Sequence, residues 1–292
     1  MKILMATMSL DIGGAETHIV ELSRELARRG HDVTVASNGG VYIPELERGG
    51  VGHVKIPFHT KRPDLVLKAI FLLRRELKRG NYDLVHAHAR IPAAICSLVC
   101  GMTGTRLVTT AHGVFKLTPA FKMIARWGER TLAVSCDIKQ YLIEGYGLPS
   151  DNIRVTVNGI DTNRFSRRPE ERHANGLEAE LGLDPSCGHR ALYVSRIDRE
   201  AAHVAFMLAE SAPELVKRFP DLEIVIAGGG TAFDELSEAA ERANTLCGRR
   251  AVILAGARSD MHRFPPVCDV FIGVSRSAME AMAACMPIVL TG

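Results

Sequence analysis

The sequence lacks the features that mark a membrane or secreted protein. It has no run of 18 apolar residues free of charge, so hydropathy predicts no transmembrane helix. The N-terminal stretch MKILMATMSLDIGG lacks the long apolar core and small-residue cleavage site of a signal peptide, and is better interpreted as a first buried strand. The seven cysteines are scattered and form no CxxC pair. This pattern is typical of reduced, buried thiols and predicts a cytoplasmic protein without a zinc site.

Two further absences limit the function. A formal net charge of only +3 gives no support for nucleic acid as a partner. The GxGxxG fingerprint of dinucleotide-binding proteins is missing from both halves of the chain, which argues against a dehydrogenase.

The composition is that of an ordinary globular chain. Of its 292 residues, 47% are hydrophobic and 24% are charged, which excludes disordered and fibrous classes and suits two domains. The charges divide unevenly. Residues 1–165 hold 22 basic and 15 acidic side chains, net +7, whereas residues 166–292 hold 14 and 18, net −4. This asymmetry suggests that the two domains meet different partners.

Short apolar runs alternate with stretches of helical period along the chain, which predicts α/β domains with parallel, doubly wound sheets. The polar segment 165–190 interrupts the alternation, so we expect an N-terminal domain over 1–168, a linker over 169–189 and a C-terminal domain over 190–292. The predicted strands are 2–7, 32–36, 83–87, 106–110, 131–134, 191–195, 223–227, 251–255, 269–274 and 288–290. The predicted helices are 15–29, 64–78, 91–100, 119–124, 137–146, 201–218, 232–246 and 277–284.

The glycine pair Gly13-Gly14 separates the first strand from its helix. Glycine lets a backbone approach a ligand closely, and the helix N-terminus beyond the pair favours a phosphate. A tight turn that needs glycine dihedral angles is an equally good interpretation.

Three histidines follow neighbouring strands of the first domain, where doubly wound sheets keep their sites. His86 and His88 are two residues apart in an extended segment, so they point to the same face of the sheet. No cysteine or carboxylate at ligand spacing joins them. A packed, hydrogen-bonded pair is therefore favoured over a metal site. His112 precedes Gly113, and its neutral imidazole could hydrogen-bond a sugar hydroxyl or a developing charge.

In the second domain, arginines and glycines follow the predicted strands. Arg196 suits bidentate contact with a phosphate, although a salt bridge to Asp198 or Glu200 is the alternative. The Gly228–Gly230 run is either a ligand loop or a flexible turn, and Arg258 either a site residue or a solvated charge.

The stretch Gly273–Ala284 is the most specific one. Ser277 could cap a helix, with Glu280 three residues later completing a capping box. The backbone N–H groups of such a helix start would also attract a diphosphate.

Taken in order, these motifs resemble those of glycosyltransferase family 4, whose members are retaining transferases of the GT-B fold. The matching strings are GGAE, RRGHDVTV, DLVHAH, VTTAHG, AVSCDIKQYL, VNGIDTNRF, VSRID, FPDLEIVIAGGG and SRSAMEAMAACMPIVL. Each string is weak alone, but the ordered set covers essentially the whole chain. The resemblance implies two Rossmann-like domains facing across a cleft, the first on the acceptor side and the second on the nucleotide-sugar side.

The resemblance also implies roles for single residues. His112 would sit beside the transferred sugar, Arg196 would neutralise the diphosphate leaving group, and Glu280 would hold the ribose hydroxyls; these three are the expected catalytic residues. The remaining residues expected to bind the donor or its phosphates are Gly13, Gly14, Arg258, Arg276, Ser277, Ala281 and Met282. No cofactor and no essential metal are implied.

The chain departs from the family pattern at three positions. Ala201 stands where the family usually has a lysine, Ile272 replaces the first glutamate of the Glu-x7-Glu motif, and Cys285-Met286 stands where a glycine is usual before the last strand. Arg276 could supply a replacement cation. Losing one phosphate-contacting cation costs about 2–4 kcal/mol of transition-state stabilisation.

The expected function is therefore transfer of a sugar from a UDP- or GDP-sugar to a glycan or lipid-linked acceptor in envelope polysaccharide or lipopolysaccharide-type assembly. A catalytically impaired nucleotide-sugar binder is the main alternative, and a nucleotide-sugar 2-epimerase is a weaker one.

Two basic stretches, 61–79 and 116–130, suggest peripheral contact with the inner face of an anionic membrane. A solvated helix face is the alternative. Because family members are longer, the strand over 288–290 also suggests that the second domain is truncated at its C-terminus and the chain is a fragment.

Overall fold

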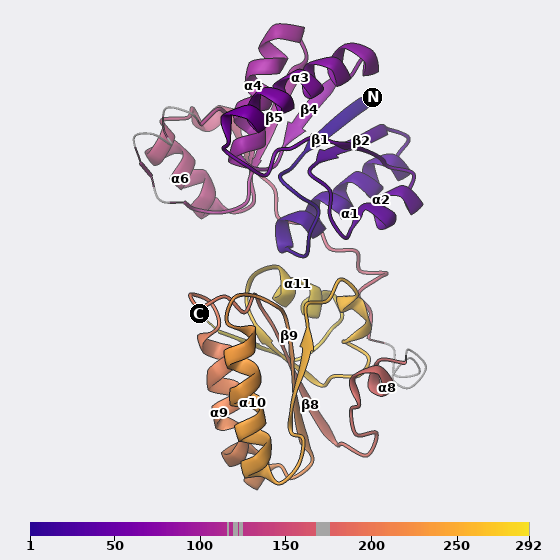
Figure 1. The fold of residues 1–292 in the computed structure, drawn as a ribbon, viewed down its shortest axis with the longest axis vertical. Helices are drawn as coiled ribbons and strands as arrows, with labels where there is room; N and C mark the ends of the chain where they lie inside the picture. The colour runs from indigo at the N-terminus through magenta and orange to yellow at the C-terminus, as the bar shows by residue number, and fades with distance from the viewer. Residues whose placement is uncertain (116, 119–121, 123–124, 168–175, 292) are drawn as a thin grey trace. The chain divides into compact units, whose positions relative to one another are not determined.

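The computed structural model describes residues 1–115, 117–118, 122, 125–167 and 176–291, and divides the chain into two compact units. The first unit comprises Met1–Gly159 and the second Ile160–Gly292 (Figure 1). The predicted helix over 119–124 lies almost entirely outside the described residues, as do residues 169–175 of the predicted linker. The rest of that linker contributes buried Leu177 and Leu183 to the core of the second unit. The predicted domain boundaries stay a prediction.

The first unit is a seven-stranded parallel sheet with strand order β3-β2-β1-β4-β5-β6-β7. Its strands are β1 (Lys2–Ala6), β2 (Asp32–Ser37), β3 (Gly52–Lys55), β4 (Leu84–Ala87), β5 (Arg106–Ala111), β6 (Arg130–Ala133) and β7 (Ile153–Val155). Its helices include α1 (Gly14–Arg28), α2 (Ile43–Arg48), α3 (Pro63–Gly80), α4 (Arg90–Thr103) and α6 (Cys136–Tyr146), with a short 3-10 turn at Ser150–Asn152.

Alternation along the central strand β1 explains why helices cover both faces of this sheet. Ile3 and Met5 pack in one cluster with residues of α1 and α2, while Leu4 and Ala6 pack in another with residues of α3 and α4. Successive strand residues point to opposite faces, so an apolar run such as Ile3–Ala6 requires helices on both sides. The predicted doubly wound arrangement is confirmed.

The second unit has a five-stranded parallel sheet with strand order β10-β9-β8-β11-β12. Its strands are β8 (His189–Val194), β9 (Leu222–Ala227), β10 (Val252–Gly256), β11 (Val270–Gly273) and β12 (Ile288–Leu290). Its helices include α8 (Leu177–Leu181), α9 (His203–Arg218), α10 (Phe233–Cys247) and α11 (Ser275–Ala283), with a 3-10 turn at Met261–Arg263. All five strands are the ones that the sequence predicts.

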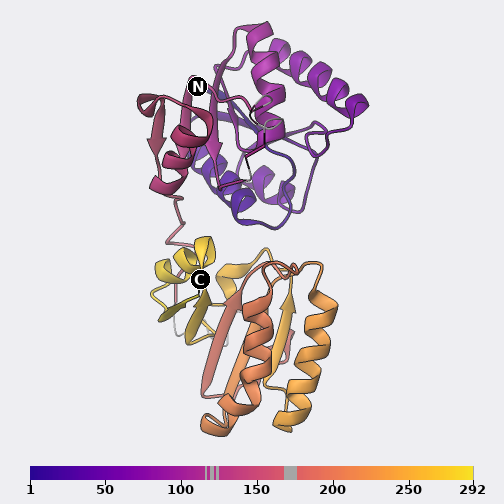
Figure 2. The ribbon, with the colours of Figure 1, turned by 90° about the vertical axis from the view of Figure 1, so that its left-hand side faces the viewer.

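The same alternation operates along β9. Ile224 and Ile226 pack against α9 and α10, which lie side by side in both ribbon views (Figures 1 and 2), whereas Val225 and Ala227 face α8 and α11. Helices therefore cover both faces of this sheet as well.

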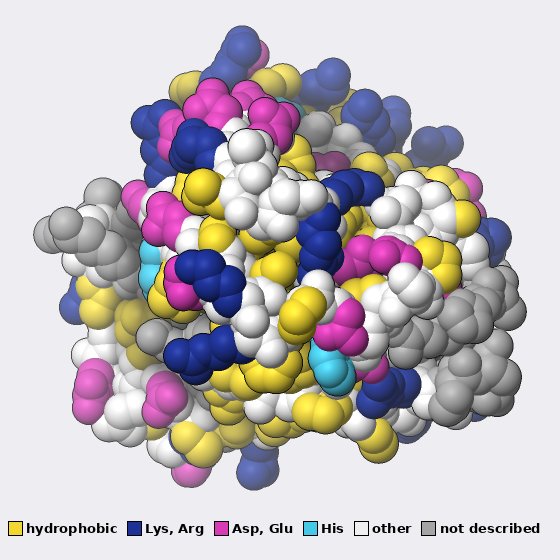
Figure 3. Space-filling model, turned by 90° about the horizontal axis from the view of Figure 1, so that it is seen from below, with side chains coloured by type: hydrophobic (Ala, Val, Ile, Leu, Met, Phe, Trp, Pro, Cys, Tyr) yellow, Lys and Arg dark blue, Asp and Glu magenta, His cyan; other side chains and the backbone are white. Residues whose placement is uncertain are grey.

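Basic and acidic side chains are interspersed on the surface that Figure 3 shows. The residues coloured there form no broad basic patch.

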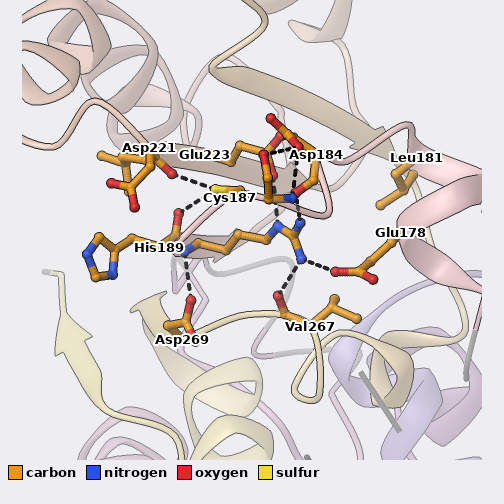
Figure 4. Close-up of polar contacts among 12 residues, drawn as sticks. Glu178, Leu181, Asp184, Cys187, His189, Asp221, Glu223, Val267 and Asp269 are labelled. Atoms are coloured by element: carbon orange, nitrogen blue, oxygen red, sulfur yellow. Dashed lines mark hydrogen bonds and ion pairs between the residues drawn. The ribbon is translucent and has the colours of Figure 1, made fainter. Parts of the chain in front are cut away.

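One buried arginine holds α8 to the second sheet. The Arg190 guanidinium lies on β8 with no exposed side-chain surface and binds the carboxylates of Glu178 and Glu223 and the backbone oxygens of Asp184 and Val267 (Figure 4). The Nε–Glu223 Oε2 distance is 2.8 Å. Sequence reasoning missed this network, because its partners are brought together only by the packing of α8 and β9 beside β8.

Helix α11 ends in a left-handed residue that is not glycine. Cys285 has φ 55°, its N–H donates to Met282 O, and the N–H of Met286 donates to Ala281 O. These are the two hydrogen bonds of a Schellman motif, whose left-handed position is usually glycine. Here the left-handed residue is Cys285, one of the pair Cys285-Met286 where the resemblance leads us to expect a glycine.

We therefore predict that Cys285→Gly raises the free energy of unfolding by about 1 kcal/mol, because a side chain disfavours left-handed backbone. Cys285→Ala is the matched control, since it removes the thiol and keeps the strain; it should change stability by less than about 0.5 kcal/mol. Urea titration of the three proteins measures the difference. Equal stability of the Gly and Ala variants would contradict the explanation.

Candidate functional site

Histidines gather at the carboxyl edge of the first sheet. Because β4 and β5 are neighbouring parallel strands, the residues that end them lie close together. His86 Nε2 lies 2.7 Å from Thr110 Oγ1, and His88 Nδ1 lies 3.1 Å from His112 Nε2. The rings of His86 and His88 pack with centroids 4.1 Å apart. The predicted packing of this pair is confirmed, although each ring takes its hydrogen bond from the next strand.

His18 joins this group from helix α1. Its ring centroid lies 5.2 Å from that of His112 and 6.0 Å from that of His88. Sequence reasoning missed His18, because a histidine within a helix carries no site signal of its own. The available clue was its place in the helix that follows β1, the strand that pairs with β4.

The two strand histidines are uncharged at neutral pH. Burial lowers the pKa of His86 to about 3 and lowers the pKa of His88 well below its ordinary value, and neighbouring histidines add to both shifts. Each ring therefore offers one N–H donor and one lone pair. Such a group can orient a neutral ligand without contributing net charge.

The Gly13-Gly14 pair lies where α1 begins. Gly13 has φ 179°, which any residue adopts, so the interpretation that left-handed or strained dihedral angles require glycine at this position is wrong. A Cβ at Gly13 would lie 2.2 Å from Glu16 Oε2. Gly14 is the first helical residue and is exposed. Contact of the pair with a donor or acceptor stays a prediction.

Arg196 follows β8 in the second unit. Its guanidinium is 78% exposed and binds Asp198, with Nη2 2.7 Å from Oδ2, so the salt bridge considered as the alternative is present. Asp198 also accepts from the backbone N–H of Thr231 at 3.1 Å, just before α10. These hydrogen bonds lower the pKa of Asp198, the Thr231 bond most, and keep it ionised as the anchor of this loop.

The Gly228–Gly230 run crosses closely over the same loop. Gly229 O accepts from the N–H of Ile197, and the Ala232 N–H donates to Ile197 O at 2.8 Å. A Cβ at Gly228 would lie 1.9 Å from Ser195 O. These glycines therefore shape the loop that carries Arg196, so the interpretation as a merely flexible turn is wrong.

Arg258 is tied into an ion-pair group. It binds Glu180 at 2.5 Å and Asp260 at 2.6 Å, and Arg263 binds the same two carboxylates. Burial raises the pKa of Asp260, but the hydrogen bonds from Arg258 and Arg263 outweigh it and lower this pKa to about 2. Arg258 is therefore not a freely solvated charge. Its expected place near the donor stays a prediction.

The predicted capping box at α11 is wrong. The helix begins at Ser275 after Val274, two residues earlier than predicted, and Ser277 Oγ donates to Val274 O at 2.9 Å instead of accepting from a backbone N–H. Glu280 accepts from Arg276 Nε at 2.9 Å, and both side chains are largely buried. The helix starts earlier because Ser275, with φ 62°, already turns the chain at the end of β11.

The start of α11 adjoins the end of β8. Ser277 Oγ lies 3.4 Å from Val194 O, two residues before Arg196. Ala281 and Met282 lie in the second half of the helix, whereas the N–H groups to which helix geometry gives no intrahelical acceptor are those of the first turn, Ser275–Ser277. A phosphate should therefore contact the earlier turn. The phosphate roles of Arg276, Ala281 and Met282 stay predictions.

A small cavity of about 10 Å³, room for one water, lies beneath this corner of the unit. It is lined by Phe165, Leu192, Val194, Met261, Pro265, Phe271, Ser277, Glu280, Ala281 and Met286. The side chain of Glu280 on α11 therefore lines a cavity whose other lining residues, apart from Ser277, are apolar.

Two doubly wound parallel sheets, together with the structural neighbours below, define the chain as a protein of the GT-B class. A glycosyltransferase from Rickettsia africae has a similar structure, with a TM-score of 0.79 and 23% identity over 100% of this chain and 79% of that one. Anabaena HepE, solved with UDP and glucose, gives a TM-score of 0.76 at 20% identity, covering 99% of this chain and 80% of that one.

Residues 12–164 match the family model described as Glycosyltransferase Family 4, and residues 188–292 match the model Glycosyl transferases group 1. The chain belongs to glycosyltransferase family 4. A phosphatidyl-myo-inositol mannosyltransferase of Mycolicibacterium smegmatis is 28% identical over 81% of this chain and 61% of its own length. A D-inositol 3-phosphate glycosyltransferase of Nocardia farcinica is 29% identical over 75% and 54%. The chain thus spans less than two thirds of these two relatives.

Proposed function

We propose that this chain transfers a sugar from a UDP- or GDP-sugar to a lipid-linked or glycan acceptor in envelope polysaccharide or lipopolysaccharide-type assembly, with retention and without an essential metal. Family membership supports the reaction class. The UDP and glucose in HepE support the donor class, and the phosphatidylinositol and inositol-phosphate acceptors named for two relatives support the acceptor class.

One observation carries the proposal: the Arg196 loop and the first turn of α11 meet at the carboxyl edge of the second sheet. The link is the contact of Ser277 Oγ, in the first turn of α11, with Val194 O, two residues before Arg196. A cation and a helix N-terminus together suit a departing nucleoside diphosphate.

Arg196 is able to exchange partners in this reaction. Its exposed pair with Asp198 contributes at most about 1 kcal/mol, so a diphosphate can replace the carboxylate at little cost. Glu280, held by Arg276, would accept the ribose hydroxyls. In the first unit, His112, whose ring contacts His88, would hydrogen-bond the sugar.

We predict that Arg196→Ala and Glu280→Ala each lower kcat/KM for the preferred nucleotide-sugar by about 100-fold, because each removes a polar partner of the donor. Arg199→Ala is the matched control, since Arg199 is an equally exposed arginine of the same loop that pairs with Glu235. A panel of UDP- and GDP-sugars with product detection measures the effect. Wild-type turnover by both variants would overturn the site assignment.

Ala201 favours a second candidate function, that of a nucleotide-sugar binder without turnover. Ala201 is exposed in the turn after Asp198, where the resemblance leads us to expect a lysine. UDP or GDP binding by calorimetry without turnover across the panel would favour this function. Activity gained by Ala201→Lys would attribute the loss to this position.

We further propose that α3 contacts an anionic membrane. Among the described helices, none is both long and apolar enough to span a bilayer, so such contact would be peripheral. Leu67 and Phe71 on α3 are 67% and 65% exposed, and exposed basic side chains surround them. The basic residues of this surface are Lys61, Arg62, Lys68, Arg74, Arg75, Lys78 and Arg79. In the second basic stretch, Lys116 lies outside the described residues.

The double variant Lys68→Gln/Arg75→Gln should bind anionic liposomes at least tenfold more weakly in flotation, because each cation near such a surface contributes about 1 kcal/mol. Lys55→Gln, an exposed change on β3, should bind as the wild type does. Flotation that does not depend on anionic lipid would contradict the proposal.

A further inference from the structure

The histidine group of the first unit has the composition of a metal site. His18 comes from α1, His88 follows β4 and His112 follows β5, and one ring nitrogen of each lies within 4.8 Å of the others. His88 Nδ1 and His112 Nε2 are 3.1 Å apart. Ligand nitrogens of a tetrahedral zinc ion, each about 2.0–2.1 Å from the metal, lie at about this separation from one another.

A second observation concerns His88 itself. Its ring is 4% exposed, and Nε2 is buried without a hydrogen-bond partner among the described residues. A buried polar nitrogen left unpaired is costly and calls for an explanation. Nε2 gains such a partner if the ring turns so that Nε2, and not Nδ1, faces the cation.

We propose that His18, His88 and His112 together bind one divalent transition-metal cation, with zinc the best-matched ion. Three imidazoles leave a fourth position open to water or another ligand. The ligand set contains nitrogen alone, so it favours zinc, copper or nickel over magnesium, calcium or manganese, which prefer oxygen. The site shares His88 and His112 with the proposed transfer site, although the proposed transfer needs no metal, so metal binding is measured on its own. The sequence pair His86 and His88 does not predict this site, because His18 and His112 come close to His88 only when the chain folds.

The test uses the full chain without an affinity tag and Co²⁺ and Zn²⁺ as probes. Equilibrium dialysis with Zn²⁺ should give one bound ion per chain, and Co²⁺ should give the visible absorption of a four-coordinate complex. His18→Gln and His112→Gln should each weaken binding by at least about 100-fold, since each removes one of three ligands. His18 and His112 are half-buried, so their substitution should disturb folding less than substitution of the buried His88.

His189→Gln and His203→Gln are the controls, because both histidines are exposed and lie in the second unit. They should bind the probes as the wild type does. Circular dichroism confirms that each variant is folded. Binding of less than one ion per chain by the folded wild type, or unchanged affinity of His18→Gln, would overturn the proposal.

Discussion

Replacing Arg190 by methionine should lower the free energy of unfolding of the second unit by about 3–5 kcal/mol. The substitution keeps most of the apolar volume but removes the guanidinium that binds the carboxylates of both Glu178 and Glu223. Both carboxylates are buried, and removing one partner of a buried ion pair leaves an uncompensated charge. Two backbone oxygens, those of Asp184 and Val267, also lose their donor.

Hydrogen exchange of the β8 and β9 amides measures this loss within the second unit, separately from the first. Arg242→Met is the matched control, because Arg242 forms an exposed pair with Glu238 at 3.9 Å and should contribute less than 1 kcal/mol. The triple variant Arg190→Met/Glu178→Leu/Glu223→Leu should recover much of the stability, since none of the three charges of this network remains buried. A loss below about 1 kcal/mol in Arg190→Met would show that the network contributes little.

Gly228→Ala should destabilise the second unit by about 3 kcal/mol and disturb the loop that carries Arg196. The residue has φ +154°, a region that side chains disfavour, and the added Cβ would lie 1.9 Å from Ser195 O. That atom is backbone, so relief of the clash must move the Ser195–Asp198 loop itself.

Gly248→Ala separates the two causes, because Gly248 also has a left-handed φ, +66°, but an added Cβ would meet nothing within 4 Å. Its cost should be that of the conformation alone, about 1–2 kcal/mol. Thermal unfolding compares the two variants, and donor binding by calorimetry should weaken only in Gly228→Ala. Equal effects would show that the close crossing of the loops is unimportant.

Long apolar runs were the most reliable guide to the fold. Lys2–Ala6 and Leu222–Ala227 are buried on both faces, so their sequences contain few polar residues and are recognisable as central parallel strands. The short or edge elements α2, β3, β7 and α8 were missed, since each has fewer apolar positions and depends on neighbours for its stability.

The sequence by itself determined the class of fold, the order of its longer apolar strands and helices, and the family, because hydrophobic period and ordered motifs are local properties of the chain. Tertiary structure alone decided which side chains meet. His18 joins His88 and His112 because α1 begins where β4 and β5 end, at one edge of the sheet. Glu178 and Glu223 enclose Arg190 because α8 and β9 flank β8. Such contacts depend on distances in the folded protein, and these distances do not follow from the separation of residues along the sequence.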